Sequence, residues 1–239
     1  MKVDILVFAA HPDDAELSCS GTILAHKDLG YSVALVDLTE GELGTRGSVS
    51  LRKQEADAAS LILGIDYREN LGFRDGFFTK DETHLLKVIE IIRKYQPQIV
   101  LANAISDRHI DHGRASDLVH DACFLAGLTK IQTHHAGINQ SPWRPKKVYH
   151  YIQDQLLKPD IVFDISAYFP KKMESILAFK SQFFNPNSNE PVTPIATPEF
   201  LDFIKGRALE FGRSIGVTYG EGYQIRTGNI GSSNLLNLL

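Results

Sequence analysis

Short β-branched runs alternate with amphipathic helical stretches through the first hundred residues, and this alternation restricts the possible folds more than any other feature. The segments 3–10, 32–39 and 98–104 are apolar enough to be buried strands, and 66–71 carries a weaker strand pattern. Strands and helices that alternate in this way form βαβ units around a mostly parallel sheet. The sequence therefore predicts an α/β, Rossmann-like fold with three layers.

Helices are expected where apolar residues recur at helical spacing and the stretch ends at glycine or proline. Four such stretches run from Leu17 to Gly30, Ser50 to Leu63, Leu85 to Ile92 and His112 to Ala126. Looser patterns beyond Gly127 indicate strands near 148–152 and 161–165 and helices near 167–181 and 199–211. We expect one domain, residues 1–239, with strand order 3-2-1-4-5 and a C-terminal extension.

Two long polar or proline-rich connections, 129–146 and 182–198, interrupt this pattern. Structureless segments of that length in a compact domain are more often lids or binding loops than simple links. His134 and His135 lie in the first connection, as solvated loop histidines or as part of a lid or a fourth metal contact. The glycine- and serine-rich tail from Arg226 is expected to be frayed or docked on a neighbouring subunit.

Charge and composition exclude several classes of partner. The formal net charge of −4 comes from interspersed signs, so no basic face for nucleic acid is expected. No apolar stretch approaches the roughly 18 to 20 residues that a membrane span needs. The only cysteines, Cys19 and Cys123, are too few for a disulfide framework and suit a reducing compartment. We expect a cytoplasmic protein that binds neither nucleic acid nor membrane.

The strongest local signal for chemistry is AHPDDAE, residues 10–16, directly after the first predicted strand. An open parallel sheet binds its ligands at that edge. Imidazole and carboxylate are suitable zinc ligands, and a turn stiffened by Pro12 can aim His11 and one aspartate at one point. The alternative is that Asp13 and Asp14 only cap the following helix, whose free backbone N–H groups favour carboxylates.

A second cluster, DRHIDH at 107–112, follows the fourth predicted strand in the same way. In the order 3-2-1-4-5 the chain reverses direction between strands one and four, so their C-terminal loops line one crevice. His11, Asp14 and His112 can therefore converge on a metal ion, unless the histidines are ordinary loop residues. Two histidines and one carboxylate leave a position open for water, as in catalytic zinc sites. Such a water reaches a pKa of about 7. Fe²⁺ suits the same face as Zn²⁺.

The remaining polar groups of this crevice suit the hydrolysis of an amide. Asp13, beside the ligand Asp14, is the candidate general base that takes a proton from the metal-bound water and passes it to the leaving amine. His109 is expected to stabilise the oxyanion or share the proton transfer, with Asp111 orienting its ring. Glu16 either belongs to this group or is a first-turn residue that complements the helix dipole.

These two motifs, with DLTEGELGTRG at 37–47 and LRKQEA at 51–56, resemble the LmbE-like, or PIG-L type, N-acetylglucosamine deacetylases. The resemblance covers nearly the whole chain and is closest to the bacillithiol-pathway branch. Members of that branch remove the acetyl group from N-acetyl-α-D-glucosaminyl L-malate in the cytoplasm. One departure is Ile110, where the family usually has proline; it leaves every chemical group in place.

The resemblance implies roles for particular residues. It implies metal ligands at His11, Asp14 and His112 and a base at Asp13, in agreement with the spacing argument. It further implies that Arg52 and Asp75 hold the sugar. A small amino-sugar substrate and a homo-oligomer, such as a hexamer, are the partners that follow from it.

Several arginines on the predicted active edge suit the two carboxylates of a malate aglycone. Arg46, Arg52, Arg74 and Arg108 lie in loops or helix starts after strands. The rigid fork of arginine favours bidentate binding of a carboxylate, and we expect Arg52, Arg46 and Arg108 to contact the substrate. The alternative pairs Arg52 with Glu55 on its own helix and leaves the other arginines solvated.

Two other functions fit the same sequence. A metal-dependent deacetylase of another N-acetylated amino sugar or small amide would differ only in its aglycone pocket. A non-catalytic Rossmann-type module that binds a sugar or nucleotide is the second. The turn after the first strand lacks the G-x-G-x-x-G phosphate cradle of such modules and carries metal-ligand residues in its place.

Overall fold

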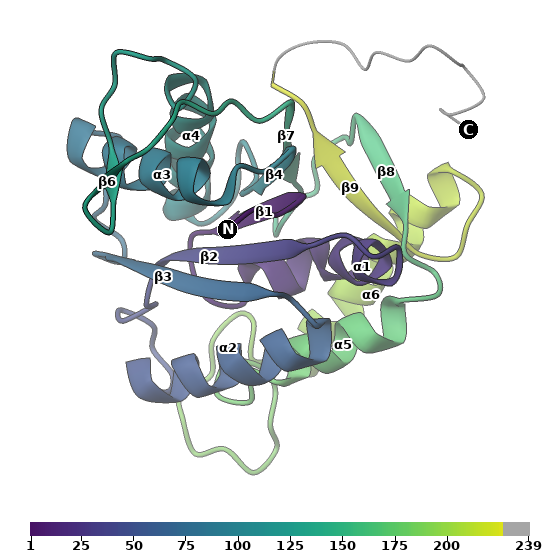
Figure 1. Cartoon of the computed structure of the whole chain (residues 1–239). Coiled ribbons are helices and arrows are strands. Elements are labelled where there is room, and N and C mark those ends of the chain that lie inside the picture. The colour runs from purple at the N-terminus through teal and green to yellow at the C-terminus, as the bar shows by residue number, and fades with distance from the viewer. Residues whose placement is uncertain (227–239) are drawn as a thin grey trace.

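A seven-stranded, mostly parallel sheet lies at the centre of the molecule, with strand order β3-β2-β1-β4-β7-β9-β8 (Figure 1). The computed structural model describes residues 1–226, so the prediction for the tail lies outside the described residues. The strands are β1 (Ile5–Ala9), β2 (Val33–Thr39), β3 (Tyr67–Phe73), β4 (Ile99–Ala102), β7 (Lys147–Tyr151), β8 (Ile161–Asp164) and β9 (Gly220–Gln224). The predicted order 3-2-1-4-5 is confirmed, with β7 as the fifth strand.

Helices cover both faces of the sheet, which gives the three predicted layers (Figure 1). Two helices, α3 (Glu82–Tyr95) and α4 (Ile110–Leu125), pack on one face. The other face is covered by α1 (Asp14–Asp28), α2 (Val49–Leu63), α5 (Phe169–Leu177) and α6 (Pro198–Ser214).

The central strands are buried on both sides, which explains their nearly continuous apolar sequence. In β1 every residue is buried: Leu6 and Phe8 face the core under α3 and α4, whereas Ile5 and Val7 face the core under α1. This alternation follows from the period of two along a strand. β1 pairs in parallel with both β2 and β4, so the loops after β1 and β4 meet at the edge where the predicted site lies.

One strand of the sheet, β9, was not predicted, because two glycines in GEGYQ weaken its strand pattern. Close packing requires them. A Cβ at Gly222 would lie 2.8 Å from the ring of Phe211 in α6, and one at Gly220 would lie 2.6 Å from Val162. β9 pairs antiparallel with β7 and β8 and brings the C-terminal extension into the sheet.

The two long connections have different structures. The first contains a short antiparallel hairpin, β5 (His134–His135) and β6 (Ile138–Asn139), whose residues are all exposed. Neither histidine of β5 lines the cavity described below. The second connection supplies Thr193, Pro194 and Ile195 to the wall of that cavity.

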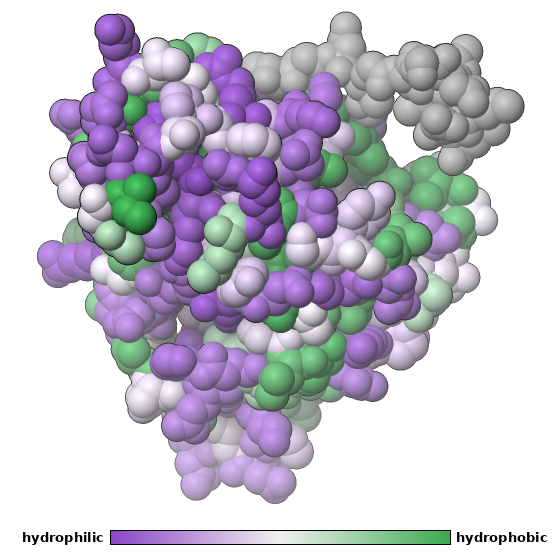
Figure 2. Space-filling model, viewed as in Figure 1, coloured by the Kyte–Doolittle hydropathy of each residue, from purple (hydrophilic) through white to green (hydrophobic). Residues whose placement is uncertain are grey.

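Hydrophilic residues predominate on the face of the molecule seen in Figure 2, and hydrophobic ones form small separate groups. Within residues 1–226, no helix combines the length and apolar character needed to cross a membrane. Both cysteines are buried and unpaired.

A buried ion network behind the first loop ties α1, β2 and β3 together. The guanidinium of Arg68 lies 2.7 Å from Oε1 of Glu16 and donates two hydrogen bonds to Asp37, at 2.8 and 3.1 Å. Glu16 is therefore paired inside the protein and does not belong to the group of cavity residues. Burial raises the pKa of Asp37 to about 6, although the charge of Arg68 opposes this shift.

We expect Arg68→Ala to lower the free energy of unfolding by about 3 to 5 kcal/mol, because two buried carboxylates would lose the cation that they share. Urea denaturation measures the change. A matched control is Lys53→Ala, which removes an exposed pair with Asp57 and should cost less than about 0.5 kcal/mol. Equal effects of the two substitutions would show that the network contributes no more than a surface pair.

Candidate active site

A cavity of about 430 Å³ opens at the C-terminal ends of the central strands. The loops after β1 and β4 supply one side of it, and α6 and the 182–198 connection supply the other. Sequence positions a hundred residues apart therefore meet here. Most of the residues predicted for the site line this cavity, with Asp111 directly behind His11: they are His11, Asp13, Asp14, Arg52, Asp75, Arg108, His109 and His112.

The turn after β1 is held in an unusual backbone conformation. Asp13 has φ of 117°, which is costly for a residue with a Cβ and is typical of functional sites. Asp13 occupies the N-cap position of α1, but its side chain makes no capping hydrogen bond. The carboxylate of Asp14 instead accepts a hydrogen bond from the backbone N–H of His11 at 3.0 Å. Neither aspartate thus acts as a simple helix cap.

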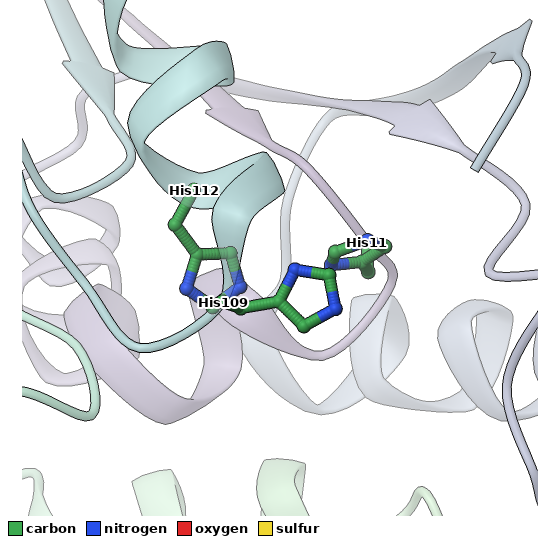
Figure 3. Close-up of side chains that lie close together, drawn as sticks. All are labelled: His11, His109 and His112. Carbon is green, nitrogen blue, oxygen red and sulfur yellow. The ribbon is translucent and has the colours of Figure 1, made fainter. Parts of the chain in front are cut away.

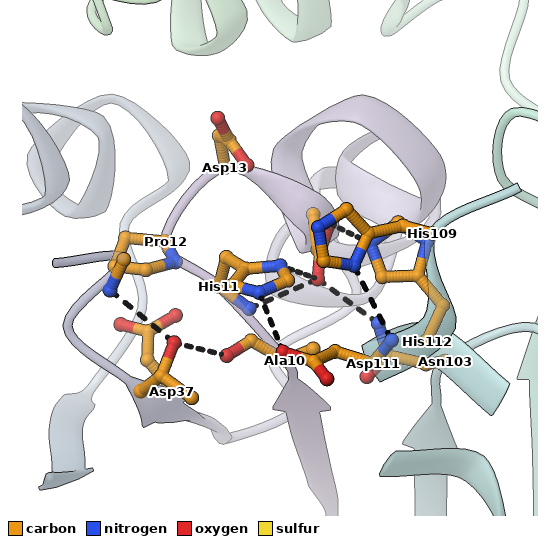
Figure 4. A network of polar contacts seen from close by, with 12 residues as sticks. Ala10, His11, Pro12, Asp13, Asp37, Asn103, His109, Asp111 and His112 are labelled. Carbon is orange, nitrogen blue, oxygen red and sulfur yellow. Dashed lines mark hydrogen bonds and ion pairs between the residues drawn. The ribbon is translucent and has the colours of Figure 1, made fainter. Parts of the chain in front are cut away.

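The imidazoles of His11, in the turn after β1, and of His112, in the first turn of α4, lie close together (Figure 4), and both contact the carboxylate of Asp14. Its Oδ1 is 3.0 Å from Nε2 of His112, and its Oδ2 is 3.6 Å from Nδ1 of His11. All three side chains are nearly buried. The three residues predicted as metal ligands therefore lie next to one another, with a different oxygen of Asp14 facing each histidine.

The other ring nitrogen of each histidine faces a carboxylate. Nε2 of His11 is 3.0 Å from Asp75 and 3.3 Å from Asp111, and Nδ1 of His112 is 2.5 Å from Asp107. Carboxylates in this position fix the orientation of a metal-binding imidazole and increase its basicity. The arrangement is what a histidine-rich metal site requires.

The site has a strong affinity for positive charge. Burial by itself would lower the pKa of His11, but hydrogen bonds to Asp111, Asp14 and Asp75 raise it well above its ordinary value. Burial also opposes the charged form of His112, but the charge of Asp14 and a hydrogen bond to Asp107 raise its pKa to about 9. Several carboxylates that hold protons on imidazoles also favour a bound cation at the same place.

The donor set fits a zinc-type ion. The rings of His11, His109 and His112 lie together at the start of α4 and the end of β1 (Figure 3), with ligand atoms within 4.8 Å of one another. A second group with the same spacing consists of His11, Asp75 and Asp111. Both groups share His11, and neither includes Asp14, which contacts His11 and His112 directly. Three imidazoles, or two imidazoles with a carboxylate, are both donor sets of catalytic zinc sites.

Asp13 lies beside these residues and is fixed by an arginine. Its Oδ2 is 3.0 Å from Nη1 of Arg52, which also donates to the carbonyl oxygen of Pro12. Burial raises the pKa of Asp13 to about 7, with Arg52 acting in the opposite direction. Arg52 does not pair with Glu55, whose carboxylate accepts hydrogen bonds from Ser181.

His109 is the N-cap residue of α4, and its ring projects into the cavity. Its Nδ1 accepts a hydrogen bond from the backbone N–H of Asp111. A neutral His109 therefore carries its proton on Nε2, the nitrogen that is free to donate to a substrate oxygen. The predicted contact of His109 to an oxyanion stays a prediction.

The carboxylate of Asp111 does not orient His109, which corrects the prediction. It lies against His11, Gly76 and Arg114. The reason is that α4 begins at Ile110. The ring of the N-cap residue His109 accepts a hydrogen bond from the backbone N–H of Asp111, while the side chain of Asp111 points away from that ring.

The predicted substrate arginines are placed differently from one another. Arg46 is buried outside the cavity, and its guanidinium donates to the carbonyl oxygens of Ser181 and Pro191 and to Ser188. It fastens the 182–198 connection and does not face the substrate space. Arg108 lies at the exposed rim, 2.5 Å from Asp154. Among the three, Arg52 lies deepest beside the converging ligands.

Sequence reasoning missed two side chains that hold Asp14. Nδ2 of Asn103 and Nε2 of Gln153 each donate to its carboxylate at 3.0 Å. Asn103 directly follows β4, and Gln153 lies two residues after the end of β7, so their place at the C-terminal edge was a usable signal. Their amides fix the carboxylate without adding charge.

Comparison with known proteins shows the family of the chain. The model of the PIG-L family, GlcNAc-PI de-N-acetylase, matches residues 6–123. The crystal structure of the conserved protein TT1542 from Thermus thermophilus superposes with a TM-score of 0.85 and 34% identity, over 97% of this chain and 98% of that one. The chain belongs to the PIG-L, or LmbE-like, family, as its motifs predicted.

The curated relatives have more than one activity. Diacetylchitobiose deacetylase of Thermococcus kodakarensis is 29% identical, over 94% of this chain and 83% of the relative. Probable N-acetyl-alpha-D-glucosaminyl L-malate deacetylase 2 of Bacillus anthracis is 28% identical, over 75% and 81%. 4-oxalmesaconate hydratase of Pseudomonas putida is 26% identical, over 74% and 73%. Family membership alone therefore leaves the substrate open.

Proposed function

We propose that this chain is a metal-dependent N-deacetylase that hydrolyses the acetamido group of an amino sugar. The observation that carries the proposal is the carboxylate of Asp14 between Nδ1 of His11 and Nε2 of His112, with Asp13 beside it. His11, Asp14 and His112 would hold Zn²⁺, or Fe²⁺ in its place. When bound there, the ion supplies Lewis acidity toward the amide carbonyl and the attacking water.

The chain's own residues account for the proton transfers. Asp13 accepts a proton from the attacking water as the oxygen adds to the carbonyl carbon. His109 donates a hydrogen bond from Nε2 to the carbonyl oxygen, on which negative charge develops. As the C–N bond breaks, Asp13 passes its proton to the leaving nitrogen, and acetic acid and a free amine are released; the acid then ionises to acetate. Arg52 holds Asp13 in position through the 3.0 Å ion pair.

We further propose N-acetyl-α-D-glucosaminyl L-malate as the substrate, in bacillithiol biosynthesis, with a homo-oligomeric enzyme in the cytoplasm. The relative from Bacillus anthracis and the resemblance of the motifs support this choice. So do Arg52 and Arg108, which place guanidinium groups at the cavity where a malate carboxylate can reach them. Because other relatives are a diacetylchitobiose deacetylase and a 4-oxalmesaconate hydratase, the identity of the substrate is what the first experiment tests.

We expect the kcat/KM for the malyl glycoside to exceed that for free N-acetylglucosamine by about 10 to 10³-fold. One or two charge-assisted contacts, each contributing about 1.5 to 3 kcal/mol, give a preference of this size. A deacetylation assay on the metal-loaded enzyme measures it. Added salt should reduce the preference, because screening weakens the carboxylate contacts and not those to the neutral amide.

Diacetylchitobiose is the informative third substrate in this assay. Equal kcat/KM for the malyl glycoside and the free sugar at low salt would remove the malate proposal. Faster turnover of diacetylchitobiose would favour the deacetylase of another N-acetylated sugar. Absence of deacetylation with all three would contradict the proposed reaction itself.

A further inference from the structure

A buried arginine from α6 lines the cavity and has no role in the proposed reaction. Arg207 is 8% exposed, and its Nη2 donates a hydrogen bond to the carbonyl oxygen of Leu17 at 3.0 Å. Its guanidinium also lies 5.5 Å from the centre of the Phe203 ring. Among residues 1–226, no carboxylate lies within 4.0 Å of this guanidinium. Arginine is almost never buried without an anionic partner, because desolvation of the charge is expensive.

The buried carboxylate that acts most strongly on Arg207 is already used by other groups. Glu221 lies 2.7 Å from Nζ of Lys172 and also accepts hydrogen bonds from Gly21 and Thr22. Glu221 is thus the ion-pair partner of Lys172, and among the described residues it does not contact Arg207. One positive charge beside the cavity remains without a counter-ion among the described residues.

The other acids that influence Arg207 are engaged as well. Asp154 pairs with Arg108 at 2.5 Å, and Asp107 lies 2.5 Å from Nδ1 of His112. Arg207 differs in this from Arg52, which faces Asp13. Unlike Arg52 and Arg108, Arg207 has no carboxylate partner among the described residues, so its remaining N–H groups can bind a ligand.

A buried hydroxyl on the same wall is also free to bind. Ser18 is 3% exposed and lines the cavity, and its Oγ has no hydrogen-bond partner among the described residues. It follows Leu17, whose carbonyl oxygen accepts from Arg207, and it lies one turn of α1 beyond Asp14. A buried hydroxyl without a hydrogen-bond partner is unfavourable, and a hydrogen bond to a ligand oxygen would offset this cost.

We propose that Arg207 and Ser18 form a subsite for an anionic group of the substrate, a carboxylate or a phosphate. The inference rests on the proposed deacetylase function and narrows its substrate to an N-acetylated amino sugar that carries an acid. The subsite lies about 5 Å along α1 from Asp14, so one ligand can reach both places. The guanidinium fork binds two oxygens of such a group, and the anion supplies the missing counter-charge.

The test compares Arg207→Met with Arg213→Met, an exposed arginine on the same helix. Both enzymes are assayed, metal-loaded, on N-acetylglucosaminyl malate and on N-acetylglucosamine. The ratio of the two kcat/KM values should fall about 10- to 100-fold in Arg207→Met, mainly through KM of the acidic substrate, and stay unchanged in Arg213→Met. Ser18→Ala should lower the ratio by a smaller factor, about 2- to 10-fold.

A binding measurement separates this inference from the proposed function. L-malate and inorganic phosphate are titrated calorimetrically into wild type and Arg207→Met, which needs no turnover. Weaker binding of either anion to the variant supports the subsite, even if the wild-type enzyme hydrolyses neither sugar. Absence of hydrolysis by the wild-type enzyme would contradict only the deacetylase proposal. Unchanged affinity for both anions in a folded Arg207→Met protein, or an unchanged kcat/KM ratio, would overturn the subsite.

Discussion

His112→Ala is expected to lose the bound metal and nearly all deacetylase activity. The substitution removes one of three converging protein ligands and leaves the carboxylate of Asp14 facing a single imidazole. Loss of the several kcal/mol that a metal ion contributes corresponds to a fall in kcat/KM of roughly 10³-fold or more. Elemental analysis after gel filtration and the deacetylation assay measure the two effects, and chelation of the wild-type enzyme should reproduce the second.

Asp111→Asn is the matched control for this prediction, since Asp111 contacts His11 from the side opposite Asp14. Removal of such an orienting carboxylate weakens metal binding by about 10- to 100-fold without removing a ligand. The variant should therefore fill with zinc at higher concentration. Full occupancy in His112→Ala together with an empty Asp111→Asn protein would assign the ion to His11, Asp75 and Asp111 instead.

Asp13→Asn is expected to keep its metal and to lose about 10²- to 10⁴-fold in kcat, the usual range for a general acid–base group. The amide has the same shape and can still lie beside Arg52, but it cannot accept the proton of the attacking water. Steady-state kinetics and metal content, measured on one preparation, give the result.

The unusual backbone of residue 13 makes a second comparison useful. Asparagine tolerates the left-handed region better than most residues, so Asp13→Asn should retain the turn at φ of 117°. Asp13→Ala tests the same chemistry with a less suitable backbone. Release of zinc by Asp13→Asn, with normal turnover once zinc is restored, would identify Asp13 as a structural residue and not as the base.

Local patterns in the sequence determined the fold and the region of the site. Short apolar runs predicted the strands of the central sheet other than β9, and helical spacing of apolar residues predicted α1 to α6. The order 3-2-1-4-5 followed from their alternation. α1 begins three residues before Leu17, the first residue of the expected stripe, because the turn of residues 11–13 leads directly into it. β9 was not predicted, because its glycines weaken the strand pattern; close packing against residues such as Phe211 requires them.

The sequence also predicted that His11, Asp14 and His112 lie close together, because the loops that follow neighbouring parallel strands lie at the same edge of the sheet. Such a prediction is possible for residues within a few positions of a strand end, because the strand order alone determines where in the fold they lie. Asn103 and Gln153, next to Asp14, obey the same rule and could have been included.

Only the tertiary structure decided which partner each side chain takes. In the structure the carboxylate of Asp111 contacts His11, and Arg46 donates hydrogen bonds to the 182–198 connection. Arg207 of α6 lies on the same cavity wall as Ser18 of α1. Such contacts join elements far apart in the chain, and they depend on how whole helices pack against the sheet. Spacing along the sequence restricts a side chain to a face or an edge, whereas its burial and its hydrogen-bond partners are set by the elements packed against it.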